Sequence, residues 1–216
     1  RLDGVTGVQT CALPILGRRT QFEYDARGNL ARTVYPDGTS ETTAYDAENH
    51  KISSTDRAGR VTQYAYDKVG NLTKTTFPDG SFTQTEYDAA GRAVRNIDQR
   101  GNATVYEYDA AGRNTAVTDA LGNRTEYAYS AGDNRTAMRD ARGNVTQYAY
   151  DAMNRLFRTT YPDGTTTVLT YDAVGRKIAE TDQAGRTTQF AYDALGRLVT
   201  VTDSLGGVTQ YAYDEV

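Results

Sequence analysis

The stretch YDAVGRKIAETDQAGRTTQFA at residues 171–191 decides the fold, because the same pattern starts again with YDALGR at Tyr192. In both directions from this point, Tyr recurs every 21 residues without an insertion or a deletion. Asp follows it in every copy except the one at Tyr129, where Ser130 stands. Self-similarity at one fixed period is the sequence signature of a repeat protein. The ten tyrosines of this register are Tyr24, Tyr45, Tyr66, Tyr87, Tyr108, Tyr129, Tyr150, Tyr171, Tyr192 and Tyr213.

Two further residue types keep the same register. Gly stands seven residues before each of the ten tyrosines, and Thr stands four residues before nine of them. Three residue types in one register over ten copies are beyond chance. After Gly17, the glycines of this register are Gly38, Gly59, Gly80, Gly101, Gly122, Gly143, Gly164, Gly185 and Gly206.

Each repeat contains two turn sequences. The first, Tyr-Asp-Ala-x-Gly, places Asp and Gly at the first and fourth positions, as type I turns prefer. The only substitutes at this Gly position are Asn49, Asp133 and Asn154. Asn and Asp are the non-Gly residues that best tolerate positive φ, so we expect a left-handed residue here, as in a type I turn followed by a G1 bulge. The second turn is either aromatic-Pro-Asp-Gly, as at 161–164, or Asp-x-x-Gly, as at 182–185.

Two segments of about seven residues lie between the turns, of the types 197–202 and 208–213. Helices are not expected, because a Gly or Pro corner interrupts the chain about every ten residues. We therefore predict an all-β fold, an array of antiparallel β-hairpins. About 20 strands make a sheet that must twist or coil, so we expect a curved or spiral form. Alternation places Thr209, Tyr211 and Tyr213 on one face, and a row of Tyr along the array results.

The composition agrees with a thin, semi-polar wall. Leu, Ile, Val and Phe make up about 16% of the chain, whereas 17 Tyr and 32 Thr supply strand-forming residues. The net charge of −4 argues against a protein that binds polyanions. One Cys and one His cannot form a Cys/His zinc site, which needs about four ligands. No apolar run approaches the ~20 residues that span a bilayer.

We predict no catalytic, cofactor-binding or metal-binding residues, and therefore no cofactor and no enzyme activity. Most Asp residues stand at the corners, where Asp caps its own turn. His50 occupies a position that Asn or Arg fills in other copies, which indicates an ordinary exposed turn residue. Arg at this position is expected to pair with corner Asp residues. These arginines are Arg92, Arg113, Arg155, Arg176 and Arg197.

The repeat register begins at Gly17. The string VTGVQTCALPI at residues 5–15 resembles the translation of a common DNA-sequencing adapter. We therefore predict that residues 1–16 are a non-native segment in which Cys11 has no functional role, and that 17–216 are the repeat array. A genuine N-terminal strand is the alternative. Both ends of the array look cut from a longer one.

The units YDAVGR at 171–176 and YDALGRL at 192–198, with their 21-residue period, resemble the Rhs/YD-repeat family over residues 17–216. The resemblance implies a spiral of β-hairpins that forms part of a hollow shell. In bacterial polymorphic toxins and insecticidal toxin complexes such a shell encloses a toxic C-terminal domain. In animal teneurins a similar shell serves cell adhesion.

The expected function is therefore non-catalytic: a shell fragment that encapsulates and helps to deliver a toxin or effector domain. The alternative is a cell-surface adhesion or carbohydrate-binding module that uses the Tyr face. The implied partners are the rest of the same polypeptide, meaning further repeats and an effector, with secretion-machinery proteins or cell-surface glycans as additional candidates. Nucleic acid is not expected as a partner, nor does the fragment carry a predicted membrane segment. The implied location is secreted or on the surface of a bacterium.

Overall fold

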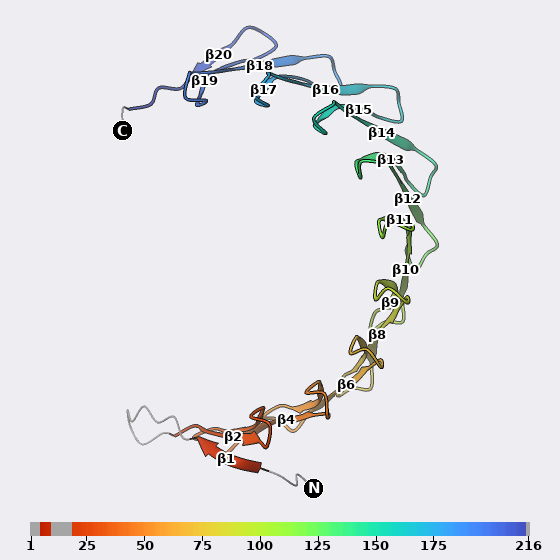
Figure 1. The fold of residues 1–216 in the computed structure, drawn as a ribbon, viewed down its shortest axis with the longest axis vertical. Coiled ribbons are helices and arrows are strands. Elements are labelled where there is room, and N and C mark those ends of the chain that lie inside the picture. Colours follow the sequence, from red (N-terminus) through yellow and green to blue (C-terminus); the bar gives the residue numbers. More distant parts are fainter. Residues whose placement is uncertain (1–4, 10–18, 215–216) are drawn as a thin grey trace. The chain divides into compact units, whose positions relative to one another are not determined.

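The computed structural model describes residues 5–9 and 19–214. These residues form 20 strands and no helix (Figure 1). Cys11, Gly17 and most of residues 1–16 lie outside the described residues. In chain order the strands are β1 (Val5–Gln9), β2 (Gln21–Asp25), β3 (Leu30–Val34), β4 (Ser40–Tyr45), β5 (Lys51–Thr55), β6 (Val61–Tyr66), β7 (Leu72–Thr76), β8 (Phe82–Tyr87), β9 (Ala93–Ile97), β10 (Ala103–Tyr108), β11 (Asn114–Thr118), β12 (Arg124–Tyr129), β13 (Arg135–Arg139), β14 (Val145–Tyr150), β15 (Leu156–Thr160), β16 (Thr166–Tyr171), β17 (Lys177–Thr181), β18 (Thr187–Tyr192), β19 (Leu198–Thr202) and β20 (Val208–Gln210).

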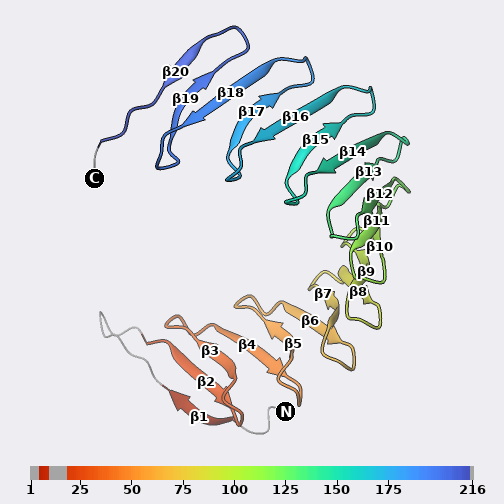
Figure 2. The same ribbon diagram turned by 45° about the horizontal axis from the view of Figure 1, so that its top comes forward.

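The chain divides into two compact units, residues 1–106 and 107–216, and the boundary falls inside β10. In the first unit each strand from β1 to β10 pairs antiparallel with the next. In the second unit the same holds from β11 to β20 (Figure 2). The predicted all-β array of antiparallel hairpins is therefore confirmed. The curved or spiral form of the whole array and its place in a hollow shell remain predictions.

Strand β1 lies within the segment that was predicted to be non-native. It pairs with β2, with Val8 opposite Glu23 and Gln9 opposite Phe22. The pairing covers the edge of β2 that faces away from β3. It does not test the origin of residues 1–16, so the division into 1–16 and 17–216 stays a prediction.

Both corners of each repeat close by the same backbone pattern. At the corner after β6, the amide of Gly70 donates to the carbonyl of Asp67 at 3.2 Å, and the amide of Asp67 donates to the carbonyl of Asn71 at 3.0 Å. The fourth corner residue has positive φ in every described copy, including the three without Gly, which are Asn49 (68°), Asp133 (64°) and Asn154 (60°). A type I turn followed by a G1 bulge requires this left-handed residue. The predicted conformation is therefore confirmed.

A further bulge follows the first corner in eight strand pairs. In β7, Leu72 lies opposite Tyr66 and Lys74 lies opposite Ala65, so Thr73 between them has no partner residue. The same register shift recurs at the equivalent place in the seven other pairs. An unpaired residue bends the bulged strand and increases its twist.

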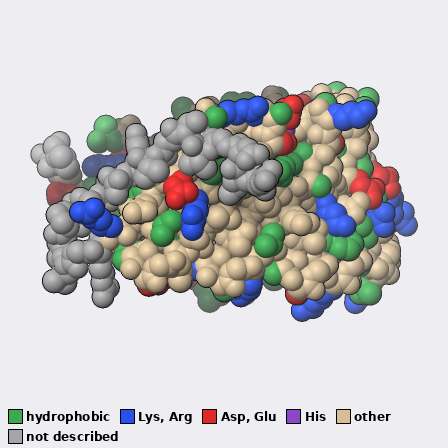
Figure 3. Space-filling model, turned by 90° about the horizontal axis from the view of Figure 1, so that it is seen from below, with side chains coloured by type: hydrophobic (Ala, Val, Ile, Leu, Met, Phe, Trp, Pro, Cys, Tyr) green, Lys and Arg blue, Asp and Glu red, His purple; other side chains and the backbone are tan. Residues whose placement is uncertain are grey.

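The sheet has very little interior. Among the described residues only Ala31, Thr33, Ala116 and Thr159 are buried. In β6 the burial alternates, with Thr62, Tyr64 and Tyr66 half-buried and the residues between them exposed. On the face shown in Figure 3, hydrophobic side chains are scattered in small groups among polar atoms and backbone. Stability must therefore come from contacts between neighbouring hairpins rather than from one deep core.

Candidate functional site

The first corners carry a recurring set of polar contacts. Asp172 illustrates the arrangement: its Oδ1 accepts the amides of Val174 at 3.0 Å and Arg176 at 2.8 Å. Its Oδ2 accepts Nε of Arg176 at 2.7 Å. The Asp thus caps its own turn and also fixes the Arg that follows the left-handed residue. The expected Arg–Asp pairing is confirmed at Arg92, Arg113, Arg155, Arg176 and Arg197.

The fixed Arg also reaches the next hairpin. The guanidinium of Arg176 lies over the ring of Tyr192, sixteen residues later, with its carbon 4.9 Å from the ring centroid. Such a cation–π contact contributes ~0.5–1 kcal/mol at exposed sites. We call the Asp–Arg–Tyr contact between successive first corners the corner link. Besides Arg176–Tyr192 it occurs at Arg113–Tyr129, Arg155–Tyr171 and Arg197–Tyr213.

The same tyrosines tie the hairpins through their hydroxyl groups. The hydroxyl of Tyr192 donates to the carbonyl of Lys177, fifteen residues earlier, at 2.8 Å. This carbonyl starts the return strand of the preceding hairpin, so each bond joins two successive repeats. Equivalent bonds are made by Tyr45, Tyr66, Tyr87, Tyr129, Tyr171 and Tyr213, among others.

The three non-Gly residues at the left-handed corner position share a second kind of link. The Nδ2 group of Asn29 donates to Oδ1 of Asn49 at 2.9 Å, and Nδ2 of Asn134 donates to Oδ1 of Asn154 at 2.9 Å. In the remaining case the guanidinium of Arg113 donates to Oδ1 of Asp133 at 2.8 Å. Each acceptor stands twenty residues after its donor. Every departure from Gly at this position therefore adds a bond to the preceding corner.

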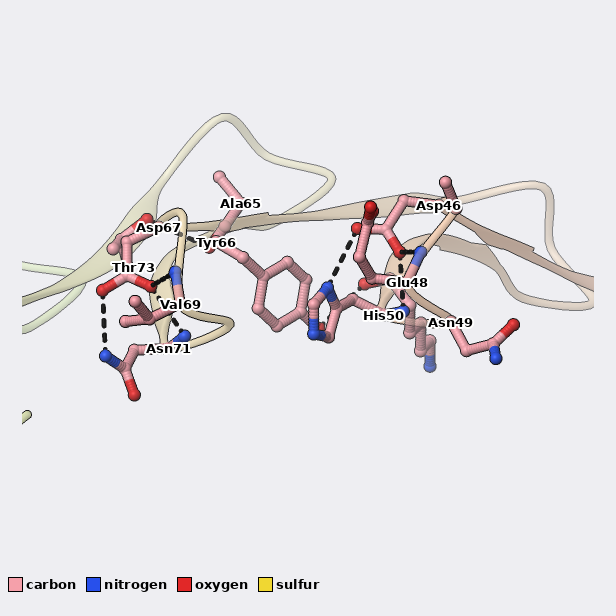
Figure 4. A network of polar contacts seen from close by, with 12 residues as sticks. Asp46, Glu48, Asn49, His50, Ala65, Tyr66, Asp67, Val69, Asn71 and Thr73 are labelled. Atoms are coloured by element: carbon pink, nitrogen blue, oxygen red, sulfur yellow. Dashed lines mark hydrogen bonds and ion pairs between the residues drawn. The ribbon is translucent and has the colours of Figure 1, made fainter.

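His50 takes the place of Arg in one corner link (Figure 4). Its Nδ1 lies 3.0 Å from Oδ2 of Asp46, and its ring stacks on Tyr66 with centroids 4.7 Å apart and planes inclined by 22°. Its side chain is 32% exposed. His50 stands in the turn, as predicted, but its side chain is half-buried rather than exposed, because the ring is held on both sides.

Asp46, Glu48 and His50 bring potential ligand atoms within 4.8 Å of one another. Asp46 already accepts the amides of Glu48 and His50 at 3.0 Å and 2.8 Å through Oδ1, and its Oδ2 contacts the imidazole. The same contacts recur at other first corners that begin with Asp, such as that of Asp172. We therefore assign the cluster to the turn and not to a cation.

The corner carboxylates are held in their charged form. The guanidinium of Arg197, followed by its backbone amide, lowers the pKa of Asp193 below its ordinary value. In the second corners, the side-chain amide of Asn102, followed by its backbone amide, lowers the pKa of Asp98. Where the corner contains Pro, the hydroxyl and amide of Thr165 lower the pKa of Asp163 in the same way. Hydrogen bonds to the ionised form are the common cause.

One ion-pair network lies outside the corners. Arg124 in β12 donates to both carboxylate oxygens of Glu107, through Nη2 at 2.9 Å, and to Glu126 through Nε at 3.0 Å. These bonds raise the pKa of Arg124 and lower that of Glu107. Ala116 lies opposite Glu126 in the neighbouring strand and is only 1% exposed. Partly exposed pairs of this kind contribute ~0–1 kcal/mol each.

The hollows between the described residues follow the sheet surface. One is lined by Thr187, Gln189 and Thr202 with the adjacent second corners, and another by Tyr35, Pro36, Asp37 and Arg57. In the second, the guanidinium carbon of Arg57 lies 4.4 Å from the ring centroid of Tyr35. Among the described residues no helix is long and apolar enough to cross a membrane.

The tyrosines of the repeat register stand directly before the first corners, and the glycines from Gly38 to Gly206 are the left-handed residues of the second corners. Several of these tyrosines, such as Tyr192, supply the ring and the hydroxyl group of the links. Sequence reasoning missed the links themselves. The constant spacing of sixteen residues between Arg and the following Tyr follows from the 21-residue period and does not by itself indicate a contact.

A scan against family models matches the RHS repeat model at residues 12–40, 45–83, 87–113, 112–145, 136–166, 171–208 and 192–216. No curated protein matches the sequence. Among solved structures, the TcdB2–TccC3–TEV crystal structure is 19% identical with a TM-score of 0.41, covering 91% of this chain and 15% of the other. The Tc holotoxin pore of Photorhabdus luminescens with a TccC3 D651A mutation is 19% identical with a TM-score of 0.42, covering 91% and 14%. The chain thus spans about one seventh of the length of these chains.

Proposed function

Because this chain belongs to the RHS repeat family, we propose that it is a section of wall in a shell that encloses an effector polypeptide and helps to deliver it. The hairpin array would act as a non-catalytic scaffold. Its partners would be further repeats and an effector region of the same polypeptide. We propose a secreted bacterial protein as the setting.

The observation that carries the proposal is the repeated link between successive hairpins. A wall needs firm connections between laterally adjacent hairpins, and it does not need a deep hydrophobic core. The backbone pairing of β15 with β16 supplies one connection between neighbouring hairpins, and the hydroxyl bond from Tyr171 to Leu156 at 2.9 Å illustrates a second. The cation–π contact from Arg155 to Tyr171 supplies a third. Similar repeats joined in this way can be added one after another, and a long wall can be built from them.

The surface chemistry supports enclosure of a polypeptide. The Tyr face of β6 presents Thr62, Tyr64 and Tyr66 half-buried, and no large apolar side chain of the described residues is fully buried. A surface of hydroxyl groups and ring edges offers hydrogen bonds and modest apolar contact together. Such a surface would contact an unfolded chain without holding it as tightly as an apolar groove would.

Electron cryomicroscopy of the longest polypeptide that contains this array tests the proposal. We expect a closed wall of hairpins around density for another part of the same polypeptide. Limited proteolysis should then cut the enclosed part more slowly than the same part expressed without the array. A solid sheet stack without an enclosed polypeptide, or equal cleavage of both forms, would count against a shell.

A further inference from the structure

The corner link of the second repeat differs from the others in one chemical respect. Arg113, Arg155, Arg176 and Arg197 carry a permanent charge between the corner Asp and the Tyr of the next hairpin. His50 occupies the same position, with Asp46 on one side and Tyr66 on the other (Figure 4). An imidazole is the side chain whose charge normally changes between pH 5 and 8. In this one corner link, the same geometry is therefore formed by a side chain that can lose its charge.

Proton uptake would strengthen both contacts of the ring. With Nδ1–H directed at Asp46, the neutral imidazole makes one hydrogen bond to a carboxylate and one ring stack. A proton added at Nε2 turns the hydrogen bond into an ion pair and the stack into a cation–π contact. The side chain is 32% exposed, so water can deliver that proton. The protonated ring then reproduces what Arg provides in the other links.

Asp46 and Tyr66, on either side of the ring, keep their charge states, so the charge of the imidazole is the one that can change. Hydrogen bonds from the amide and ring of His50 outweigh partial burial and hold the pKa of Asp46 below its ordinary value, so this carboxylate stays charged. Burial, with Tyr64 and Asp46 adding to it, raises the pKa of Tyr66, which stays neutral. Glu48 is the second carboxylate beside the ring.

Three charged groups of the adjoining elements, Arg27, Lys51 and Asp67, have partners other than the imidazole. From the preceding corner, Arg27 donates to the carbonyls of Asp46 and Ala47. In β5, the ammonium of Lys51 lies 5.0 Å from the Tyr64 ring centroid. In the next corner, Asp67, beside Lys68, accepts the side chain and amide of Asn71. These contacts do not involve the imidazole.

We propose that the His50 link is a pH-sensitive joint between the second and third hairpins. It is tight when His50 carries a proton and looser when it does not. The links built with Arg keep their charge between pH 5.5 and pH 8. The proposal concerns this joint alone and does not depend on the shell function.

Hydrogen exchange of the 216-residue chain at pH 5.5 and pH 8, corrected for intrinsic rates, tests the proposal. The reporters are the amides of Asp46 and His50, which are bonded to each other's oxygens across the corner. The matched internal control is the corner of Asp172 and Arg176, which has the same bonds. We expect exchange at the His50 corner, divided by exchange at the control, to rise about three- to tenfold from pH 5.5 to pH 8.

Two variants distinguish an effect of the His50 imidazole from an effect of the neighbouring groups. His50→Arg should abolish the pH dependence and keep exchange slow at both pH values. His50→Asn, the residue type found at Asn29 and Asn71, should give fast exchange at both. A constant ratio in the unmodified chain would overturn the proposal, as would the same pH dependence in His50→Arg.

Discussion

Asn29 donates its side-chain amide to Oδ1 of Asn49 at 2.9 Å, and Asn49 has a φ of 68°. A left-handed backbone costs a non-Gly residue roughly 1 kcal/mol. The two other non-Gly residues at this position, Asp133 and Asn154, accept equivalent bonds from the preceding corner. The bond to the neighbouring hairpin therefore offsets the backbone cost, and the two features belong together.

The first prediction concerns Asn49. Asn49→Gly removes the bond and also the backbone cost, so we expect the free energy of unfolding to change by less than about 0.5 kcal/mol. Asn49→Ala removes the bond and keeps the cost, so we expect a loss of about 1–2 kcal/mol. Urea titration measures both. In an Asn29→Ala background the bond is already lost, so Asn49→Gly should then stabilise the chain. Equal effects in both backgrounds would disprove the coupling.

The second prediction introduces a hydrogen-bond acceptor at a corner position where Gly stands. A Cβ atom built on Gly175 would lie 3.4 Å from Nη1 of Arg155, whereas one on Gly185 meets nothing within 4 Å. Both glycines have positive φ, 92° and 77°. We expect Gly175→Asp to reduce the free energy of unfolding by about 0.5–1 kcal/mol less than Gly185→Asp, because only the former gains an Arg partner. A difference that persists in 1 M salt would not be electrostatic.

The corners could be predicted from the sequence, whereas the links could not. Asp172 and Gly175 act within one turn, and local turn chemistry identifies them without knowledge of the rest of the chain. The contact from Arg176 to Tyr192 depends on the register between two hairpins. That register includes the bulge at residues such as Thr73, and no local sequence pattern predicts this register. The partial burial of the His50 side chain was missed for the same reason, because its ring is held by Tyr66 of the next hairpin.

The third prediction tests the hydroxyl bond of the Tyr register. Tyr171→Phe leaves the ring under Arg155 and removes only the donor to the carbonyl of Leu156. We expect a loss of about 1 kcal/mol in the free energy of unfolding. Tyr171→Ala also removes the ring and its stacking, and should lose distinctly more. If Tyr171→Phe unfolds at the same urea concentration as the unmodified chain, the hydroxyl bond adds nothing to the joint between hairpins.

The fourth prediction concerns acid. Hydrogen bonds within the corners lower the pKa of many Asp residues, among them Asp98 and Asp193, below the ordinary value of about 3.9. A carboxyl whose pKa is lower in the folded state stabilises the fold above its unfolded pKa and ceases to do so as the pH falls through the folded pKa. We expect the urea midpoint to hold from pH 7 to about pH 5 and then to fall steadily towards pH 2. A urea midpoint that stays level down to pH 2 would contradict the expectation that the ionised corner carboxylates stabilise the fold.

The last prediction isolates the backbone requirement of a second corner. Gly122 has a φ of 82°, and a Cβ atom added to it meets nothing within 4 Å. A substitution here therefore creates no clash, and its cost is that of the left-handed conformation alone. A β-branched residue tolerates this conformation least, whereas Asn tolerates it best.

Gly122→Val should accordingly reduce the free energy of unfolding by about 1–3 kcal/mol, and Gly122→Asn by less than about 1 kcal/mol. Leu121→Ala, in the same turn and 88% exposed, serves as the control and should stay within about 0.5 kcal/mol of the unmodified chain. All three are compared by urea titration at pH 7. Equal losses for Val and Asn would mean that the corner accepts a right-handed residue, and the Gly register would then need another explanation.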